Sequence, residues 1–416
     1  MGITGQQQKT IELLNPWYTG QEVDLGIRRN SYLDQVSSIV NKQKEIFFLL
    51  GSRRVGKTVI LLQYIYKLIE EGVSPKNILF LSLDNTNIQD LDLFSYLSDS
   101  SYEYVFLDEV HYFSNWAQIL KSLYDLPLFK AKIICSGSSS KLIEDNKAFL
   151  TGRTTSISVY PLSFNEFKEF LPNSQNQLHD YLNYGGYPEY VLEKQPNYLN
   201  DLLRDIIEKD ILKLHKVDNS KYLFDICQIL AKQIGFKGSS NKIANVIGID
   251  NKTALNYIDY LHEVKLIDQI YQYSDSLNEQ LYAPKKYYFE DLGMRNSFVG
   301  FSDIGSLVEN AIFMKLSIKF GLENIYYLSD GKANEVDFVV RLKDDKLLFV
   351  ESKYNNLQES IANSLNPHFF KDVYGKTVID RIVVTDNVEG GYAIKDVQIR
   401  MVYLQSFLEK DSTLEF

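Results

Sequence analysis

The sequence lacks the features of secreted and membrane-spanning proteins. Its 416 residues contain only two cysteines, Cys135 and Cys227, which form no Cys-x-x-Cys metal site and no disulfide framework. No apolar run approaches the ~18 residues of a membrane helix. The N-terminal stretch MGITGQQQKTIELL also lacks the basic start and apolar run of a signal peptide. We therefore expect a cytoplasmic protein with no membrane partner.

An excess of positive charge is also missing. The chain has 44 Lys and Arg against 54 Asp and Glu, a net charge of −10. The overall charge therefore does not indicate a nucleic-acid-binding protein, although a local basic patch is compatible with it. Hydrophobic residues make up 45% of the chain, which is typical of a soluble globular protein of two to four domains.

Short apolar runs separated by helical patterns fill the first part of the chain. Buried strands are predicted at 44–51, 78–83, 104–108, 132–136 and 154–160. Continuously apolar strands that alternate with helices indicate a parallel sheet covered on both faces. The sequence therefore predicts an α/β domain over residues 1–162.

The segment GSRRVGKT fits the phosphate-loop pattern G-x-x-x-x-G-K-[ST], and it follows a predicted strand and precedes a predicted helix. We expect its backbone amides to surround the phosphates of a nucleotide. Lys57 would reach the β- and γ-phosphates, and the Thr58 hydroxyl would bind Mg²⁺. The predicted nucleotide-binding residues of this loop are Gly51, Ser52, Arg53, Arg54, Val55, Gly56, Lys57 and Thr58.

The strand VFLDE ends in two adjacent carboxylates and matches a Walker B strand. Asp108 would hold the Mg²⁺ of the bound ATP, and Glu109 would polarise the attacking water as the catalytic base. A solvated strand end followed by an acidic helix cap is the alternative. The phosphate loop upstream favours the catalytic interpretation.

Three further positions are candidates on weaker grounds. Ser136 ends the next strand, where it would sense the γ-phosphate or lie in an ordinary serine-rich turn. Arg153 follows in a loop, either as an arginine finger acting on a neighbouring copy of a homo-oligomer or as an ion-paired surface residue. Arg53 and Arg54 would contact the nucleotide or a neighbour.

The pattern becomes helical after Pro161. Residues 163–218 are predicted to form a helical lid or connector, and residues 219–300 a winged helix. Ala254, Ile258, Leu261 and Val264 would form the inner face of its second helix. Its exposed face would contain Lys252, Thr253, Asn256 and Tyr257. These side chains would bind DNA, or the module would pack on the ATPase and mediate assembly.

Residues 301–416 are predicted to form a separate α/β domain with four notable side chains. Glu309 lies on a helix, Asp337 begins a strand, and Glu351 and Lys353 share one face at the end of the next strand. A hairpin would bring Asp337 beside them. This arrangement resembles the PD-(D/E)XK nuclease core. The resemblance implies Asp337 and Glu351 as metal ligands, Lys353 as the water-orienting residue and Glu309 as an accessory carboxylate. A structural Glu–Lys pair at a solvated strand end is the alternative.

The chain as a whole resembles a family of AAA-like ATPases from bacteria and archaea. The motifs that carry the resemblance are GSRRVGKT, FLDEVHYFSNW, IICSGSSSKLI, LTGR and YPLSFNEF, followed by GGYPEYV, RDIIEKDI and ENAIFMKL…EVDFVV…FVESK. The resemblance implies ATP and Mg²⁺ as cofactors, a P-loop ATPase domain, a winged helix and a restriction-endonuclease-like C-terminal domain.

Three functions are compatible with these features. The first is an ATPase whose nucleotide state controls a DNA-binding, nuclease-like C-terminal half. The second is a nucleotide-gated scaffold without nuclease activity. The third is a metal-dependent nuclease regulated by ATP.

Overall fold

The computed structural model describes residues 3–42, 44–137, 148–330, 334–354, 375–394 and 397–415. The chain forms two compact units, Met1–Tyr160 and Pro161–Phe416. The predicted α/β fold class is confirmed. Among the described helices, none has the length and apolar character needed to cross a membrane.

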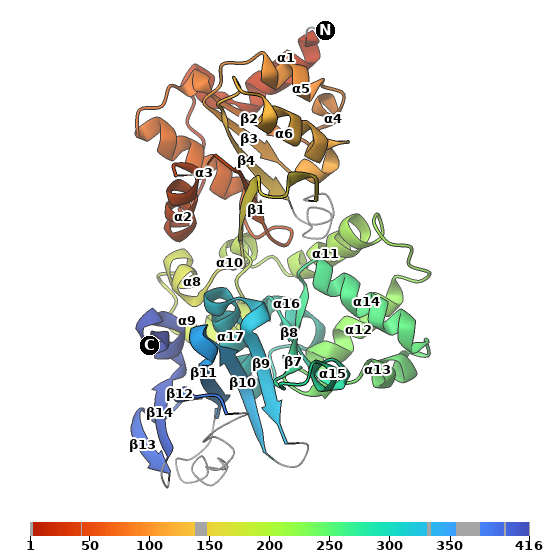
Figure 1. Ribbon diagram of the computed structural model, residues 1–416, viewed down its shortest axis with the longest axis vertical. Helices are drawn as coiled ribbons and strands as arrows, with labels where there is room; N and C mark the ends of the chain where they lie inside the picture. The colour runs from red at the N-terminus through yellow and green to blue at the C-terminus, as the bar shows by residue number, and fades with distance from the viewer. Residues whose placement is uncertain are drawn as a thin grey trace. The chain divides into compact units, whose positions relative to one another are not determined.

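The first unit is built on a parallel five-stranded sheet with the strand order β2-β3-β4-β1-β5 (Figure 1). Its strands are β1 (Ile46–Leu50), β2 (Ile78–Ser82), β3 (Tyr104–Asp108), β4 (Lys132–Gly137) and β5 (Thr154–Ser158). The three central strands, β1, β3 and β4, are buried along nearly their whole length because helices cover both faces. The carboxyl ends of β1, β3 and β4 therefore meet at one edge of the sheet.

Helices lie on both faces of this sheet. One face packs on α5 (Leu93–Ser98) and α6 (Trp116–Asp125), which bury Leu97, Trp116 and Leu120 against Phe48. The other face packs on α3 (Lys57–Glu70), where the rings of Tyr64 and Phe106 lie 6.1 Å apart. Phe48 and Phe106 point to opposite faces, as the pleat requires, because Phe48 on β1 aligns with Cys135 on β4, and Cys135 aligns with Leu107, the residue next to Phe106 on β3.

The N-terminal segment forms α1 (Gly5–Leu14) and α2 (Asn30–Val40). Asn15 is fully buried, and its side chain exchanges hydrogen bonds with both backbone groups of Phe80 on β2. The segment is therefore part of the first unit.

The second unit contains one nine-stranded mixed sheet in the order β13-β14-β12-β11-β10-β9-β7-β8-β6. Its strands are β6 (Lys237–Gly238), β7 (Ile267–Gln272), β8 (Lys285–Phe289), β9 (Ile325–Ser329), β10 (Glu335–Arg341), β11 (Leu347–Ser352), β12 (Val378–Thr385), β13 (Gly390–Ile394) and β14 (Val397–Tyr403). The parallel pairing of β7 with β9 joins the strands of the predicted winged helix to those of the predicted nuclease-like domain. These two segments therefore share a sheet. The helix expected between β11 and β12 lies outside the described residues.

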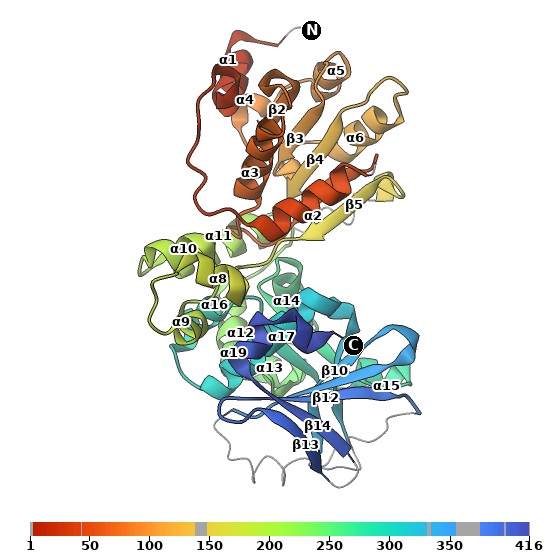
Figure 2. The same cartoon turned by 90° about the vertical axis from the view of Figure 1, so that its left-hand side faces the viewer.

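Most helices of the second unit lie on one side of this sheet (Figure 2). The described helices of this unit are α8 (Phe164–Phe170), α9 (Gln177–Tyr184), α10 (Pro188–Glu193), α11 (Tyr198–Asp205), α12 (Lys221–Lys232), α13 (Ser240–Ile247), α14 (Asn251–Glu263), α15 (Leu277–Tyr282), α16 (Leu292–Val299), α17 (Ile304–Phe320) and α19 (Leu404–Glu409). The central helix α17 packs on the sheet through Phe313, whose ring stacks on Tyr288 at 4.4 Å.

Helix α14 buries most of the face that the sequence predicts. Ala254, Ile258, Leu261 and Val264 are all buried. The prediction for Tyr257 is wrong, because this side chain is only 4% exposed and belongs to the core. Asp250 caps the helix by accepting a hydrogen bond from the Thr253 backbone N–H, and Lys252 and Asn256 face solvent.

Candidate functional site

The phosphate loop connects β1 to α3 and depends on two glycines. A Cβ on Gly51 would lie 2.2 Å from the backbone oxygen of Val159, so no larger residue fits there. Gly56 begins the helix with a φ of +98°, which favours glycine. The loop is thereby followed at once by a helix N-terminus, whose free amides and dipole attract an anion.

Lys57, Thr58 and Asp108 lie together at this edge of the sheet. The Lys57 ammonium donates to the backbone oxygens of Gly51 at 3.1 Å and Ser52 at 2.9 Å. The Thr58 hydroxyl donates to Asp108 Oδ2 at 2.8 Å, and the Ser136 hydroxyl donates to Asp108 Oδ1. The structure therefore brings the helix, the Walker B strand and the end of β4 together through one carboxylate.

The carboxyl group of Asp108 lies in a largely apolar environment. Burial and the nearby charge of Glu109 raise its pKa to about 6, while the Ser136 and Thr58 hydroxyls and Lys57 lower it. A hydroxyl and a carboxylate are the oxygen donors that Mg²⁺ prefers. The residues at this edge therefore fit a Mg²⁺ ion bound with a nucleotide.

Glu109 lies next to Asp108 with its backbone in the left-handed region, at a φ of 53°. Its N–H donates to the Ser136 hydroxyl at 3.1 Å, so Ser136 contacts both acidic residues. The carboxylate of Glu109 lies 3.4 Å from Nδ1 of His111. The sequence pattern treated His111 as a packing residue and missed this contact, because nothing in the spacing alone indicates it.

Arg29 supports the loop from below, and the sequence analysis did not identify it. Its side chain is 4% exposed, and its guanidinium donates to the backbone oxygens of Val55 at 2.8 Å and Tyr160 at 3.0 Å.

Within the loop, Arg53 donates to the Tyr112 hydroxyl at 3.2 Å, and Arg54 is exposed in the left-handed region.

Arg153 lies at the opposite edge of the same sheet. Its backbone oxygen accepts a hydrogen bond from Ile46 at the start of β1, whereas the phosphate loop begins after the end of this strand. The rise along a strand places these edges roughly 15 Å apart. The guanidinium is ion-paired with Asp125 at 3.0 Å and lies over the Tyr124 ring. The structure therefore does not bring Arg153 to its own phosphate loop.

The four candidates of the C-terminal segment converge. Strands β10 and β11 form the expected hairpin, with Phe338 opposite Val350. The Asp337 N–H donates to Glu351 Oε2 at 3.0 Å, and the Ser352 N–H donates to Asp337 Oδ2 at 3.0 Å. Lys353 Nζ lies 2.6 Å from Glu351 Oε1.

Burial changes the acidity of this cluster. Burial and Asp337 raise the pKa of Glu309 to about 7 and that of Glu351 to about 8, against the opposing effects of Lys286 and Lys353. Both carboxyls therefore hold protons more tightly than exposed glutamates do.

Lys286 on β8 completes the cluster, and the sequence analysis missed it because the strand itself was not predicted. Its ammonium lies 3.3 Å from Asp337 Oδ1 and 3.4 Å from Glu309 Oε1. The run of aromatic residues in the segment KKYYF, which is typical of a strand, was the available signal. Lys286 and Tyr288, two residues apart, share one face, and the Tyr288 hydroxyl donates to Glu309 at 2.8 Å.

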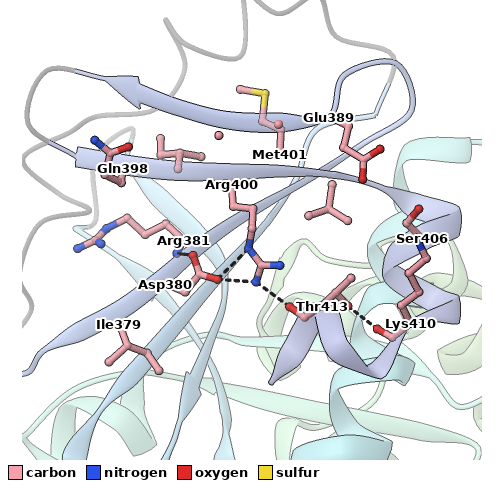
Figure 3. A pocket seen from close by; sticks show the side chains of 14 residues that line it. Ile379, Asp380, Arg381, Glu389, Gln398, Arg400, Met401, Ser406, Lys410 and Thr413 are labelled. Carbon is pink, nitrogen blue, oxygen red and sulfur yellow. Dashed lines mark hydrogen bonds and ion pairs between the residues drawn. The ribbon is translucent and has the colours of Figure 1, made fainter. Parts of the chain in front are cut away.

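A cavity of about 450 Å³ lies elsewhere in the second unit, over β12, β13, β14 and α19 (Figure 3). Its Arg400 contacts Asp380 at 3.1 Å and the Thr413 backbone oxygen at 2.7 Å. Asp380 therefore balances the positive charge of Arg400 inside the unit. In this respect the cavity differs from the phosphate loop, where backbone amides at a helix N-terminus attract an anion.

Three protein families match successive parts of the chain. Residues 43–168 match the AAA domain family, residues 175–304 match a domain of unknown function (DUF8612), and residues 304–404 match another (DUF4143). The AAA match includes the phosphate loop, the Walker B strand, Ser136 and Arg153.

Similar whole proteins come from distant organisms. An uncharacterized protein of Haemophilus influenzae is 29% identical, covering 85% of this chain and 93% of its own length. An uncharacterized protein of Methanocaldococcus jannaschii is 27% identical, covering 86% of this chain and 85% of its own.

Solved structures with a partial likeness include two ATPase-type proteins. RuvB of Thermotoga maritima has a TM-score of 0.33 and 16% identity, covering 58% of this chain and 89% of its own. AMPPCP-bound DnaA from Aquifex aeolicus has a TM-score of 0.31 and 18% identity, covering 60% and 92%. These scores are too low to support an argument about function. The motif order, the parallel sheet and the family match identify residues 43–168 as an AAA-like P-loop domain.

Proposed function

We propose that this protein binds ATP with Mg²⁺ at the phosphate loop and hydrolyses it to switch conformation. The observation that carries the proposal is the contact of Thr58 and Ser136 with the two oxygens of Asp108. These contacts join the start of α3, the end of β3 and the end of β4 in one hydrogen-bonded group, which supports a site for Mg²⁺ and the γ-phosphate there.

In this mechanism the chain's own residues orient the reactants. The loop amides and Lys57 hold the phosphates, and Mg²⁺ supplies neutralising charge when it is bound. Glu109 accepts a proton from the attacking water, while Ser136 fixes the Glu109 backbone and the Asp108 carboxylate together. The adjacent His111 would orient the Glu109 carboxylate.

Turnover of ATP by wild type, Lys57→Ala and Glu109→Gln tests this function. We expect Lys57→Ala to lose ATP affinity, and Glu109→Gln to keep ATP bound while turnover falls roughly 10²- to 10⁴-fold. Glu103→Gln is the matched control, because Glu103 precedes the same strand at the opposite edge. Equal turnover in all four proteins would contradict the proposal.

We further propose that the nucleotide state controls DNA binding by the second unit. The support is helix α14, which has a capped start and solvent-facing Lys252 and Asn256, side chains suited to phosphates and base edges. Anisotropy of labelled DNA with ATP or ADP tests this role. Equal, weak binding in both states that Lys252→Ala does not change would instead favour the nucleotide-gated scaffold.

We also propose that the assembly is a homo-oligomer in which Arg153 acts on the nucleotide of a neighbouring copy. Its position at the edge opposite its own phosphate loop supports a role in trans. A metal-dependent nuclease regulated by ATP is the remaining alternative. The convergence of Asp337, Glu351 and Lys353 favours it. The lysine and backbone N–H groups that already contact both carboxylates weigh against it.

A further inference from the structure

Lys286 is one of the most deeply buried charged residues of the described chain. Its side chain is 1% exposed, and its ammonium contacts three carboxylates. Glu335 lies 2.6 Å away, Asp337 3.3 Å and Glu309 3.4 Å. An ammonium has three hydrogens to donate, and here each carboxylate supplies an acceptor.

The two acids predicted as metal ligands are already supplied with donors. Asp337 has Lys286 on one oxygen and the Ser352 N–H on the other. Glu351 has Lys353 on one oxygen and the Asp337 N–H on the other. Each of the four oxygens therefore contacts a donor of the protein itself.

The neighbouring acids also contact lysines. Glu335 contacts Lys286 through Oε1 and Lys237 through Oε2 at 2.7 Å. Glu309 contacts Lys286 and the Tyr288 hydroxyl. Three lysines thus face four carboxylates.

Removing the ammonium would be costly. An isolated buried charge loses its hydration without compensation, so a buried lysine stays charged only among partners such as these. Burial opposes the charged form, but Tyr288 and the three carboxylates together raise the pKa of Lys286 well above its ordinary value. A metal ion between Asp337 and Glu309 would have to displace the ammonium from two of its three carboxylates.

The donor set therefore does not fit a nuclease metal centre in this arrangement. Within the described residues, no group of three or more His, Cys, Asp or Glu side chains is arranged to hold a metal ion. We propose that Lys286 takes the place of the metal ion, so that this cluster takes up no divalent cation and cleaves no nucleic acid. The cluster then joins β8, α17, β10 and β11 as an internal ion network. This inference is independent of ATP hydrolysis by the first unit.

Mn²⁺ binding to the full-length protein, measured by loss of the free-ion EPR signal without nucleotide, tests the proposal. An Asp108→Asn background removes the metal-side carboxylate of the phosphate loop. We expect no stoichiometric Mn²⁺ uptake while Lys286 is present. Stoichiometric uptake that Glu351→Gln abolishes would overturn the proposal, as would metal-dependent DNA nicking that Lys353→Ala abolishes.

Substitution of the lysine provides the second arm. We expect Lys286→Met to lower the melting temperature by roughly 10 °C, because the carboxylates lose their shared cation. Mn²⁺ should restore part of this loss and bind the variant. Lys285→Met is the matched control, since Lys285 lies next along the strand, over the Tyr271 ring, outside the cluster. Equal melting of the two variants without metal would refute the role of Lys286. If Lys286→Met does not fold, the Mn²⁺ measurement on the protein with Lys286 still decides.

Discussion

The phosphate-loop edge and the C-terminal cluster both gather carboxylates and a lysine at strand ends, yet their donors differ. Asp108 receives two hydroxyl hydrogen bonds, from Thr58 and Ser136. Asp337 instead receives an ammonium and a backbone N–H. Hydroxyl donors are neutral and leave the carboxylate's charge in place, whereas an ammonium cancels it.

A carboxylate whose donors are neutral keeps its charge and can bind a metal ion, whereas a carboxylate that faces an ammonium stabilises the fold. A divalent cation is attracted by negative charge, and in the first unit the hydrogen bonds to the Asp108 carboxylate come from neutral hydroxyls. The second unit instead pairs its acids with Lys286, Lys353 and Lys237. Proximity of acids is therefore a weaker guide to a metal site than the charge of their partners.

Arg153 is expected to have a strong effect on ATP turnover, because it would supply positive charge to the first unit of a neighbouring copy. If Arg153 acts in trans, Arg153→Ala lowers ATP turnover by roughly 10³-fold, because an arginine finger stabilises charge in the transition state. Mixing this variant with Lys57→Ala should restore activity, since the second variant supplies Arg153 to an intact phosphate loop. Steady-state turnover of the mixture checks this.

Asp125→Ala is the control, because it frees Arg153 from its ion pair without removing it. No recovery in the mixture would contradict an action in trans. The first unit would then receive no cation from a neighbouring copy.

The next effect separates the two aspartates directly. Asp108→Asn should lower Mg²⁺-dependent turnover by roughly 100-fold, as expected for loss of a group that organises a metal's surroundings. Asp337→Asn should leave turnover unchanged, because its carboxylate balances Lys286. Turnover measured across Mg²⁺ concentrations distinguishes them. An equal loss of turnover in both variants would show that the two aspartates do not differ in this way.

The smallest effect concerns the hydroxyl donors. Ser136→Ala removes hydrogen bonds to Asp108 and to the Glu109 backbone, and we expect turnover to fall about tenfold. Ser82→Ala is the matched control, because Ser82 ends the neighbouring strand beside Asp108 and its hydroxyl bonds to Asp84. A similar loss in both variants would show that Ser136 has no special role.

The sequence predicted the first unit well because its signals are local. The loop GSRRVGKT and the strand VFLDE each contain the residue types on which the prediction depends. Parallel strands then bring their carboxyl ends to one edge of the sheet. Arg29 could not be predicted, because its contacts with Val55 and Tyr160 span 26 and 131 positions of the chain. Only the folded chain brings these positions together.

The second unit shows the opposite balance. The hairpin of β10 and β11 was predictable from two apolar runs, and it places Asp337 beside Glu351 as expected. Strand β8 was missed, and with it Lys286. Tyr257 was placed on the wrong face of α14, because its burial depends on neighbouring elements and not on helical periodicity alone.

The α/β class, the phosphate loop and the residue types available for nucleotide chemistry follow from short-range pattern and backbone geometry, so they could be predicted from the chain alone. Which cation faces each carboxylate depends on how distant segments meet in the folded chain. Ion pairing acts over a few ångströms in space, and Lys286 meets Asp337 across 51 positions of chain. As we propose, acidic residues of the same types therefore serve chemistry in one unit and the fold in the other.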